Sequence, residues 1–148
     1  MTEERPEIEY GFFCEFVRPE QNGKTTAIGM WGDVCRYEGA PPAPMPNLGL
    51  HVYIANRRQI PYNVVVRLDI PGLPEPAEFR FALASSPGAV GSNLNLNIAN
   101  LVFTEPGRVR AKVIIEADPP VERDFVLRVE FLPPGTTTAS GGPGTTAP

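Results

Sequence analysis

Residues 109–115 (VRAKVII) and 125–131 (FVLRVEF) are the two segments that decide the fold class of this chain. Apolar residues recur at every second position in both, which is typical of β-strands with one buried face. We expect the two segments to form an antiparallel hairpin. The register that keeps both apolar rows on one face pairs Val113 with Val129, Ile115 with Leu127 and, on the solvent side, Lys112 with Glu130.

Six segments upstream show the same alternation of apolar residues. They span residues 8–16, 28–30, 48–54, 64–70, 79–83 and 94–98. Clusters of proline and glycine, such as residues 39–46 and 71–74, separate them. Seven or eight short strands with turn signals between them predict an all-β chain, and specifically an antiparallel immunoglobulin-like β-sandwich.

The predicted strands belong to one domain over residues 7–132. A chain of 148 residues is expected to form a single domain and can build a core without a disulfide or a metal. Residues 1–6 are predicted to be a flexible N-terminus. Residues 133–148 contain only Pro, Gly, Thr, Ala and Ser, which cannot fill a core, so we predict a disordered tail.

The charge balance argues against two classes of partner. A formal net charge of −4 does not provide the basic surface that nucleic acids or anionic membranes require. The N-terminus lacks the features of a secretory signal, and no stretch is apolar for long enough to span a membrane. We therefore expect a cytoplasmic protein, with association to a virion or similar particle as an alternative, and reduced cysteines.

Three stretches, residues 13–15 (FCE), 22–24 (NGK) and 27–31 (AIGMW), resemble the opening hairpin of a family of small, uncharacterised bacterial β-sandwich proteins. Proteins of that family begin with a strand ending in Cys and an acidic residue, a turn with Gly-Lys, and a strand leading to Ile-Gly. Residues 105–110 (EPGRVR) are similar to a later segment of the family. The resemblance covers roughly residues 8–132. It implies an immunoglobulin-like sandwich and supplies no catalytic residues.

The triplet Gly23-Lys24-Thr25 is also the ending of a phosphate-binding loop. That motif requires a glycine where this chain has Arg18, and a helix after it, whereas the following residues favour a strand. Asn22-Gly23 is a strong hairpin signal because both residues tolerate positive φ. We predict a turn there.

Groups capable of catalysis or metal binding are few. His51 is the single histidine, and no serine or carboxylate is spaced to work with it, so we expect a surface or half-buried strand residue. Cys14 is predicted to lie opposite a residue near Trp31, and therefore not opposite Cys35. Residues 118–124 come closest to a calcium loop but carry too few carboxylates. We assign no catalytic residue, metal or cofactor.

Two features are candidate interaction surfaces. A row of asparagines, which are disfavoured in strands, repeats opposite the leucines of one predicted strand: Asn93, Asn95, Asn97 and Asn100. Arg57 and Arg58, which follow the third predicted strand, could contact an anion. For the asparagines the alternatives are an exposed strand of no consequence or a loop whose asparagines bond locally, and for the arginines the alternative is a solvated strand face.

A further set of apolar residues is predicted to point outward and, if adjacent, to form an exposed patch of the kind that marks an interface. These residues are Phe13, Val17, Val65, Ile114 and Val126. Together these features predict a non-enzymatic binding or assembly module that acts on an unidentified protein partner or by self-association. A phage or particle accessory protein is the alternative, and a small loop-based hydrolase or calcium-dependent domain is a third hypothesis.

Overall fold

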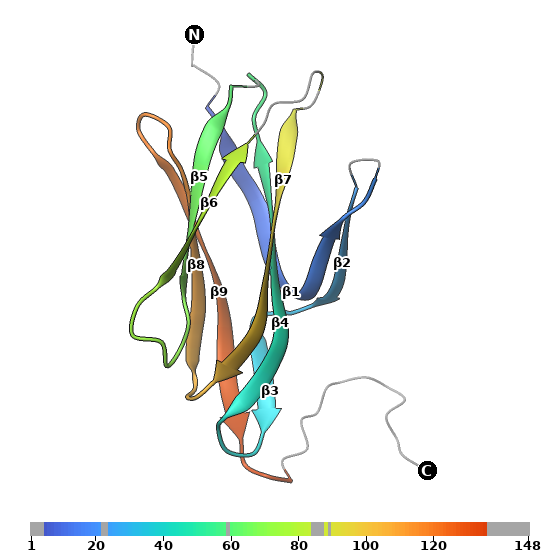
Figure 1. Ribbon diagram of the computed structural model, residues 1–148, viewed down its shortest axis with the longest axis vertical. Helices are drawn as coiled ribbons and strands as arrows, with labels where there is room; N and C mark the ends of the chain where they lie inside the picture. The colour runs from blue at the N-terminus through green and yellow to red at the C-terminus, as the bar shows by residue number, and fades with distance from the viewer. Residues whose placement is uncertain (1–4, 22–23, 59, 84–87, 89, 136–148) are drawn as a thin grey trace.

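The computed structural model of the chain describes residues 5–21, 24–58, 60–83, 88 and 90–135 (Figure 1). Regular secondary structure in these residues consists of nine β-strands, and no helix among them could cross a membrane. The strands are β1 (Glu7–Pro19), β2 (Thr25–Met30), β3 (Val34–Glu38), β4 (Ala43–Ala55), β5 (Tyr62–Asp69), β6 (Ala77–Leu83), β7 (Gly91–Phe103), β8 (Gly107–Ile115) and β9 (Val121–Leu132).

The strands form two sheets. The first has the order β2-β1-β4-β7, is antiparallel throughout and curls into a half-barrel. The second has the order β3-β9-β8-β5-β6 and is mixed, because β3 runs parallel to β9. The all-β prediction is confirmed. There are nine strands rather than the seven or eight expected, because β3 is a short edge strand with few core residues to reveal it. The expectation of purely antiparallel pairing is also wrong, since β3 runs parallel to β9.

The main core lies between the two sheets. Leu50 and Val52 of β4 belong to the same buried cluster as Val64 and Val66 of β5. All four are almost completely inaccessible to solvent. Alternate residues of facing strands therefore fill one apolar layer, as the period-two pattern indicates.

The predicted register of the closing hairpin is wrong. Val113 lies opposite Arg123 and Ile115 opposite Val121, while Lys112 pairs with Asp124 and approaches the Glu122 carboxylate at 3.4 Å. The shift from the predicted pairing is an even number of residues, so every side chain keeps its face. Alternation alone could not distinguish the two registers.

An irregularity in β1 changes which side chains face the core. The pairing with β4 shifts between Ile8 and Tyr10, as it does at a β-bulge. Ile8 and Phe13 both enter the main core, whereas Tyr10 is 47% exposed. A single inward row along residues 8–16 is therefore not formed.

The predicted outward apolar patch is also corrected. Phe13, Val17 and Val65 are buried, Ile114 is half-buried, and of the five residues only Val126 is exposed. Val17 lies against β4 and β7, close to Gly49 and hydrogen-bonded to Asn97. The Arg80 side chain, opposite Val65, reaches across β5 to Glu116 with a 3.3 Å separation of charged atoms, and its methylenes can cover the valine.

Three predictions fall on residues that the structure does not describe. The flexible N-terminus is one, at residues 1–4, and the tail is another, from residue 136 onward. The third is the turn at residues 22–23, although β1 and β2 pair on either side of it, with Pro19 opposite Thr25. The last described residue, Gly135, donates its N–H to the Glu38 carboxylate at the end of β3.

Candidate functional site

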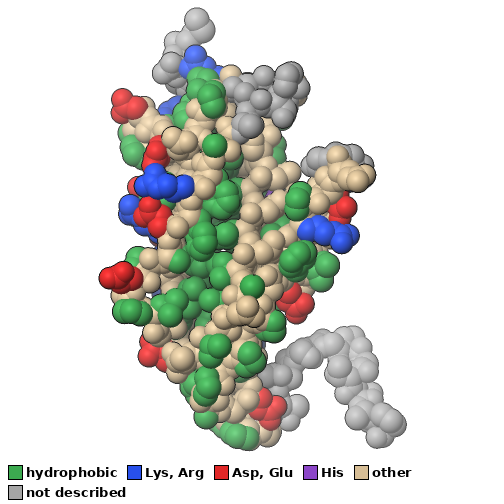
Figure 2. Space-filling view, viewed as in Figure 1, with side chains coloured by type: hydrophobic (Ala, Val, Ile, Leu, Met, Phe, Trp, Pro, Cys, Tyr) green, Lys and Arg blue, Asp and Glu red, His purple; other side chains and the backbone are tan. Residues whose placement is uncertain are grey.

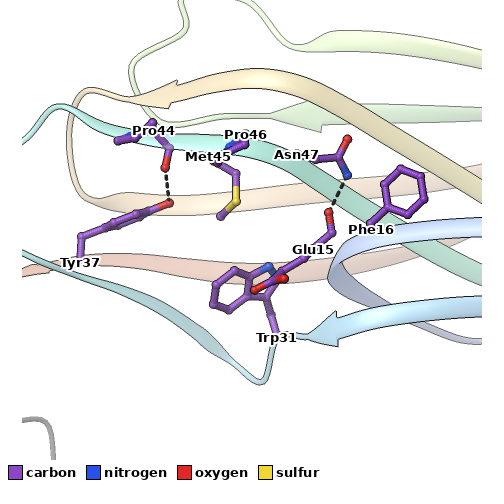
Figure 3. Close-up of a pocket in the computed structure, with 8 residues that line it drawn as sticks. All are labelled: Glu15, Phe16, Trp31, Tyr37, Pro44, Met45, Pro46 and Asn47. Carbon is purple, nitrogen blue, oxygen red and sulfur yellow. Dashed lines mark hydrogen bonds between the residues drawn. The ribbon is translucent and has the colours of Figure 1, made fainter.

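A cavity opens where β1 separates from β4. The last residue pair between the two strands is Cys14 with Gly49, and β4 extends further, back to Ala43, without β1 beside it. The space has a volume of about 460 Å³ (Figure 3). Its apolar lining consists of Phe16, Trp31, Tyr37, Pro44, Met45 and Pro46, and its polar lining of Glu15 and Asn47.

Trp31 is held by the β1–β2 hairpin. It directly follows β2, and its backbone N–H donates to the Phe13 carbonyl at 2.9 Å, so the ladder continues one residue beyond Met30. Cys14 lies opposite Met30, which confirms the prediction that Cys14 is paired with a residue near Trp31. The hairpin pairing therefore fixes the backbone that carries the indole.

Tyr37 forms the opposite wall. Its ring stacks on Phe131, with centroids 5.6 Å apart, and its hydroxyl donates to the Pro44 carbonyl at 3.3 Å (Figure 3). Burial raises the pKa of the Tyr37 hydroxyl, and its interaction with Cys35 raises it further. The hydroxyl therefore remains a neutral hydrogen-bond donor at physiological pH.

The polar corner of the cavity ties three strands together. Asn47 donates from Nδ2 to the Glu15 carbonyl at 2.5 Å and to Asn97 Oδ1 at 3.2 Å. Glu15 is an exposed residue at the edge of the cavity (Figure 3). The lining is thus mostly apolar, with one carboxylate at its rim.

The indole N–H of Trp31 has no hydrogen-bond partner. It is the one buried side-chain nitrogen or oxygen, among the residues described, that lacks one. A buried donor without an acceptor costs about 1–3 kcal/mol, and such groups in native proteins call for a specific explanation. Because this nitrogen is inaccessible to solvent, a ligand in the cavity reaches it only if the side chains that cover it move.

A second cavity of about 320 Å³ also borders the tryptophan. Trp31 lines both cavities, and the second also includes the exposed carboxylates Asp33 and Asp124. The described residues contain no group of three or more His, Cys, Asp or Glu that could hold a metal.

The two cysteines are buried and unpaired. Burial raises the pKa of both Cys14 and Cys35, so both remain thiols rather than thiolates at neutral pH. Neither lies in the polarising environment that activates a nucleophilic cysteine. They act as small packing residues.

The structure gives two of the predicted asparagines internal partners. Asn97 accepts a hydrogen bond from the Val17 N–H at 3.0 Å and donates to the Val17 carbonyl at 2.6 Å. Asn95 Oδ1 lies 2.7 Å from His51 Nδ1. Asn93 and Asn100 are exposed. The amides of Asn95 and Asn97 therefore hold the curl of the first sheet, which their spacing alone does not reveal.

His51 is buried, with 5% of its surface exposed, so the prediction of a surface or half-buried residue is wrong. The curl of the sheet places its ring against Tyr10 and Phe12, at centroid separations of 5.9 and 5.1 Å. With Asn95 at Nδ1, these neighbours are typical of a packed structural histidine rather than of a catalytic base.

Arg57 and Arg58 lie far from the aromatic cavity. They are exposed and follow the end of β4, whereas the cavity is beside the beginning of that strand. Arg57 borders a smaller hollow of about 200 Å³ with Arg5 and Glu7. The asparagine row and the arginines therefore do not form one site.

Sequence reasoning missed the aromatic cavity. Its lining comes from three strands and the β2–β3 connection, so no local motif contains it. The available signals were the single tryptophan, Trp31, and the proline-rich stretch at residues 41–46.

These observations define the class of the protein as a two-sheet, all-β domain with an aromatic-lined cavity at the junction of β1, β3 and β4. A model described as a "Family of unknown function (DUF6941)" matches residues 9–130, and the chain belongs to this family. This match confirms the expectation that the chain belongs to an uncharacterised family. No curated protein matches the chain.

Proposed function

We propose that this protein is a non-enzymatic binding module that takes a segment of a partner protein into the aromatic cavity. The observation that carries the proposal is the largely apolar cavity lined by the rings of Phe16, Trp31 and Tyr37. A volume of about 460 Å³ is within the range of small-ligand and side-chain pockets. The lining offers rings and one rim carboxylate, which favours binding over turnover.

The ligand class that suits the lining is an extended, proline-rich segment. Pro44 directs its carbonyl to Tyr37, and both Pro44 and Pro46 lack the N–H that an added β-strand would need from this edge. A polyproline II segment needs no such ladder, since its carbonyls are free acceptors and its rings pack on aromatic side chains. Glu15 at the rim favours a neighbouring arginine or lysine on the ligand.

The strand order supports an immunoglobulin-like arrangement as part of this proposal. In immunoglobulin-like sandwiches one sheet contains the order A-B-E and the other G-F-C. Here β1-β4-β7 and β9-β8-β5 follow those two orders along the chain. In this interpretation β2 is an insertion after the first strand, and β3 is a short parallel strand beside the last.

The test is selection from a random peptide library on the immobilised full chain, with binding of selected peptides measured by Trp31 fluorescence. Because Trp31 is the single tryptophan, its emission reports on the two cavities that it lines, and Phe16, which lines only the first, distinguishes them. Phe16, which is 40% exposed, can be replaced by serine without opening the core, and Leu73→Ser is a matched control on a distant turn. We expect Phe16→Ser to abolish binding and Leu73→Ser to preserve it.

The outcomes separate function from ligand class. Selected peptides rich in proline that bind through the cavity support both statements. Peptides without proline that still require Phe16 would retain the binding function and reject the ligand class. If no peptide changes Trp31 emission, the binding proposal itself fails. Trp31→Phe, assayed with labelled peptide, should bind about tenfold more weakly, since it removes part of the aromatic wall of the cavity.

A structural role in a phage or similar particle is the second candidate. The β1–β2 hairpin extends away from the rest of the molecule (Figure 1) and carries the exposed side chains of Phe16, Ile28 and Met30. An apolar arm of this kind suits docking onto an assembly. Sedimentation of the protein with particles, lost in Ile28→Ser and unaffected by Leu73→Ser, would support this role.

A further inference from the structure

The edge strand β7 differs from the other edge strands of the two sheets. It has 13 residues and contains no charged residue and no proline. By contrast, β3 and β6 both carry charges, and β2 is short and contains Gly29 with a φ of 63°. Soluble proteins normally protect a sheet edge with charge, proline or shortness, because an open edge can pair with another chain.

The register shows which backbone groups of β7 face outward. The Asn56 N–H donates to the Val90 carbonyl at 2.8 Å, and the pairing with β4 then continues without a shift through Val52–Leu94 and Leu50–Leu96. In an antiparallel pair, alternate residues exchange hydrogen bonds with the partner strand. Leu94 and Leu96 therefore bond to β4, and the backbone N–H and C=O groups of the odd-numbered residues from 93 to 97 point to the open edge.

This edge is held in place before any partner binds. The side chain of Asn97 is tied to Val17, and that of Asn95 to His51, both on the inner side of the curled sheet. These contacts fix the strand on which the outward backbone groups lie. A preordered edge loses less conformational entropy on association than a mobile one.

Apolar side chains also line the opening beside β7. Figure 2 shows a band of hydrophobic side chains between β6 and β7. Phe79 and Phe81 of β6 and Ile98 and Leu101 of β7 are only partly buried against the core. A strand added beyond β7 would continue the first sheet over this band and cover it.

We propose that β7 is a self-association surface on which a second copy of the chain adds its own β7, antiparallel, across a two-fold axis. A second copy fits because β7 is uncharged, so self-pairing brings no like charges together. Pairing centred on Asn95 places Asn93 opposite Asn97 and Leu94 opposite Leu96, which matches the two faces. The regular stretch ends at Asn100, where φ is 58°.

The test is the mass of the full chain by size-exclusion chromatography with light scattering over a range of concentrations. We expect twice the chain mass of 16.1 kDa at high concentration. Asn93 is exposed, and its N–H faces the open edge, so Asn93→Pro removes an outward donor without breaking the β4 ladder. Asn93→Pro and Asn93→Lys should each weaken the dimer about tenfold or more.

Asn93→Ala is the matched control, because it keeps the backbone donor and should remain dimeric. Circular dichroism should be the same for all three variants, and so should the melting temperature at a concentration low enough for every variant to be monomeric. Amide hydrogen exchange gives a direct readout, with slower exchange at residues 93, 95 and 97 as concentration rises. A chain that is monomeric at every concentration, a folded Asn93→Pro that still dimerises, or a dimer lost on removal of residues 136–148 would overturn the proposal.

Discussion

At the scale of single residues, polar side chains in this protein act mainly by satisfying backbone groups. Asn97 bonds to both the N–H and the carbonyl of Val17, where β1 has left β4. Without it, those two groups would lie beside the inner face of the sheet with no strand to pair with. One asparagine side chain thus replaces a missing segment of β-ladder.

Replacing Asn97 with alanine should therefore lower the free energy of unfolding. The loss of two hydrogen bonds to a partly buried backbone predicts a decrease of about 1–3 kcal/mol in urea denaturation. Asn93→Ala, on an exposed neighbour of the same strand, should change the stability by less than about 0.5 kcal/mol. Equal effects of the two substitutions would contradict a structural role for the Asn97 amide.

Tyr37 and the two cysteines predict how stability depends on alkaline pH. Burial raises the pKa of Tyr37, Cys35 and Cys14, so each contributes stability that is present below its unfolded pKa and lost as pH rises through its folded pKa. The free energy of unfolding should decline as pH increases above about 9, where unfolded thiols ionise, and further above about 10 for tyrosine.

Tyr37→Phe should remove the upper part of this decline. The variant also loses the hydrogen bond to Pro44, so it should be less stable at neutral pH and have a flatter profile above pH 10. Urea titrations at several pH values measure both effects. An unchanged slope above pH 10 in Tyr37→Phe would show that the alkaline dependence has another origin.

At the scale of elements, the curl of the first sheet requires close contact between strands. An added Cβ at Gly49 of β4 would lie 2.8 Å from Cys14 Sγ and 3.2 Å from the Val17 backbone nitrogen. A side chain at this position would therefore push β1 away from the inner face of the sheet. Gly49 allows the curl through its small size, and its conformation is that of an ordinary strand residue.

Gly49→Ala should destabilise the protein by about 1–3 kcal/mol, because overpacking a tight contact displaces backbone as well as side chain. Gly32→Ala is the control, since nothing lies within 4 Å of a Cβ there. Thermal unfolding of the two variants measures the difference. If the Gly49→Ala protein is as stable as the Gly32→Ala protein, β1 can move away from Gly49 without a loss of stability, and the contact is not required for the curl.

The β8–β9 hairpin shows what strand patterns leave open. The alternation identified both strands and their inward faces, but the connection is shorter than the predicted pairing implied, and Ile115 meets Val121. The β1 bulge has the opposite effect, since one extra residue moves Phe13 into the core and Tyr10 out of it. Register and bulges depend on partner strands, which a single segment does not contain.

At the scale of the whole molecule, the strands extend from Glu7 to Leu132, and the chain continues past them as Pro, Gly, Thr, Ala and Ser. Gly135 contacts Glu38 at the end of β3. The residues beyond it have no side chain suited to a core position. The stability of the domain should therefore reside in the strands.

Removal of residues 136–148 should leave the melting temperature within about two degrees of the full chain. Calorimetry of the full and shortened proteins is the measurement. The cut is placed after Gly135 so that its contact with Glu38 remains. A large decrease would mean that the tail packs on the domain, and the aromatic cavity beside Tyr37 would be the first place to look.

The sequence by itself determined the all-β class, the position of eight of the nine strands and the apolar face of most of them. It also placed Cys14 opposite a residue near Trp31. These features follow from local rules. Burial of one strand face imposes a period of two, and a tight turn sets the pairing on either side of it.

Only the tertiary structure decided the register of the last hairpin, the burial of His51, the internal use of Asn95 and Asn97, and the aromatic cavity. Each depends on which segments meet in space. The curl of the first sheet covers the histidine and engages the asparagines, and the separation of β1 from β4 opens the cavity. Contacts between residues distant in the chain have no signature in the local alternation of apolar and polar residues.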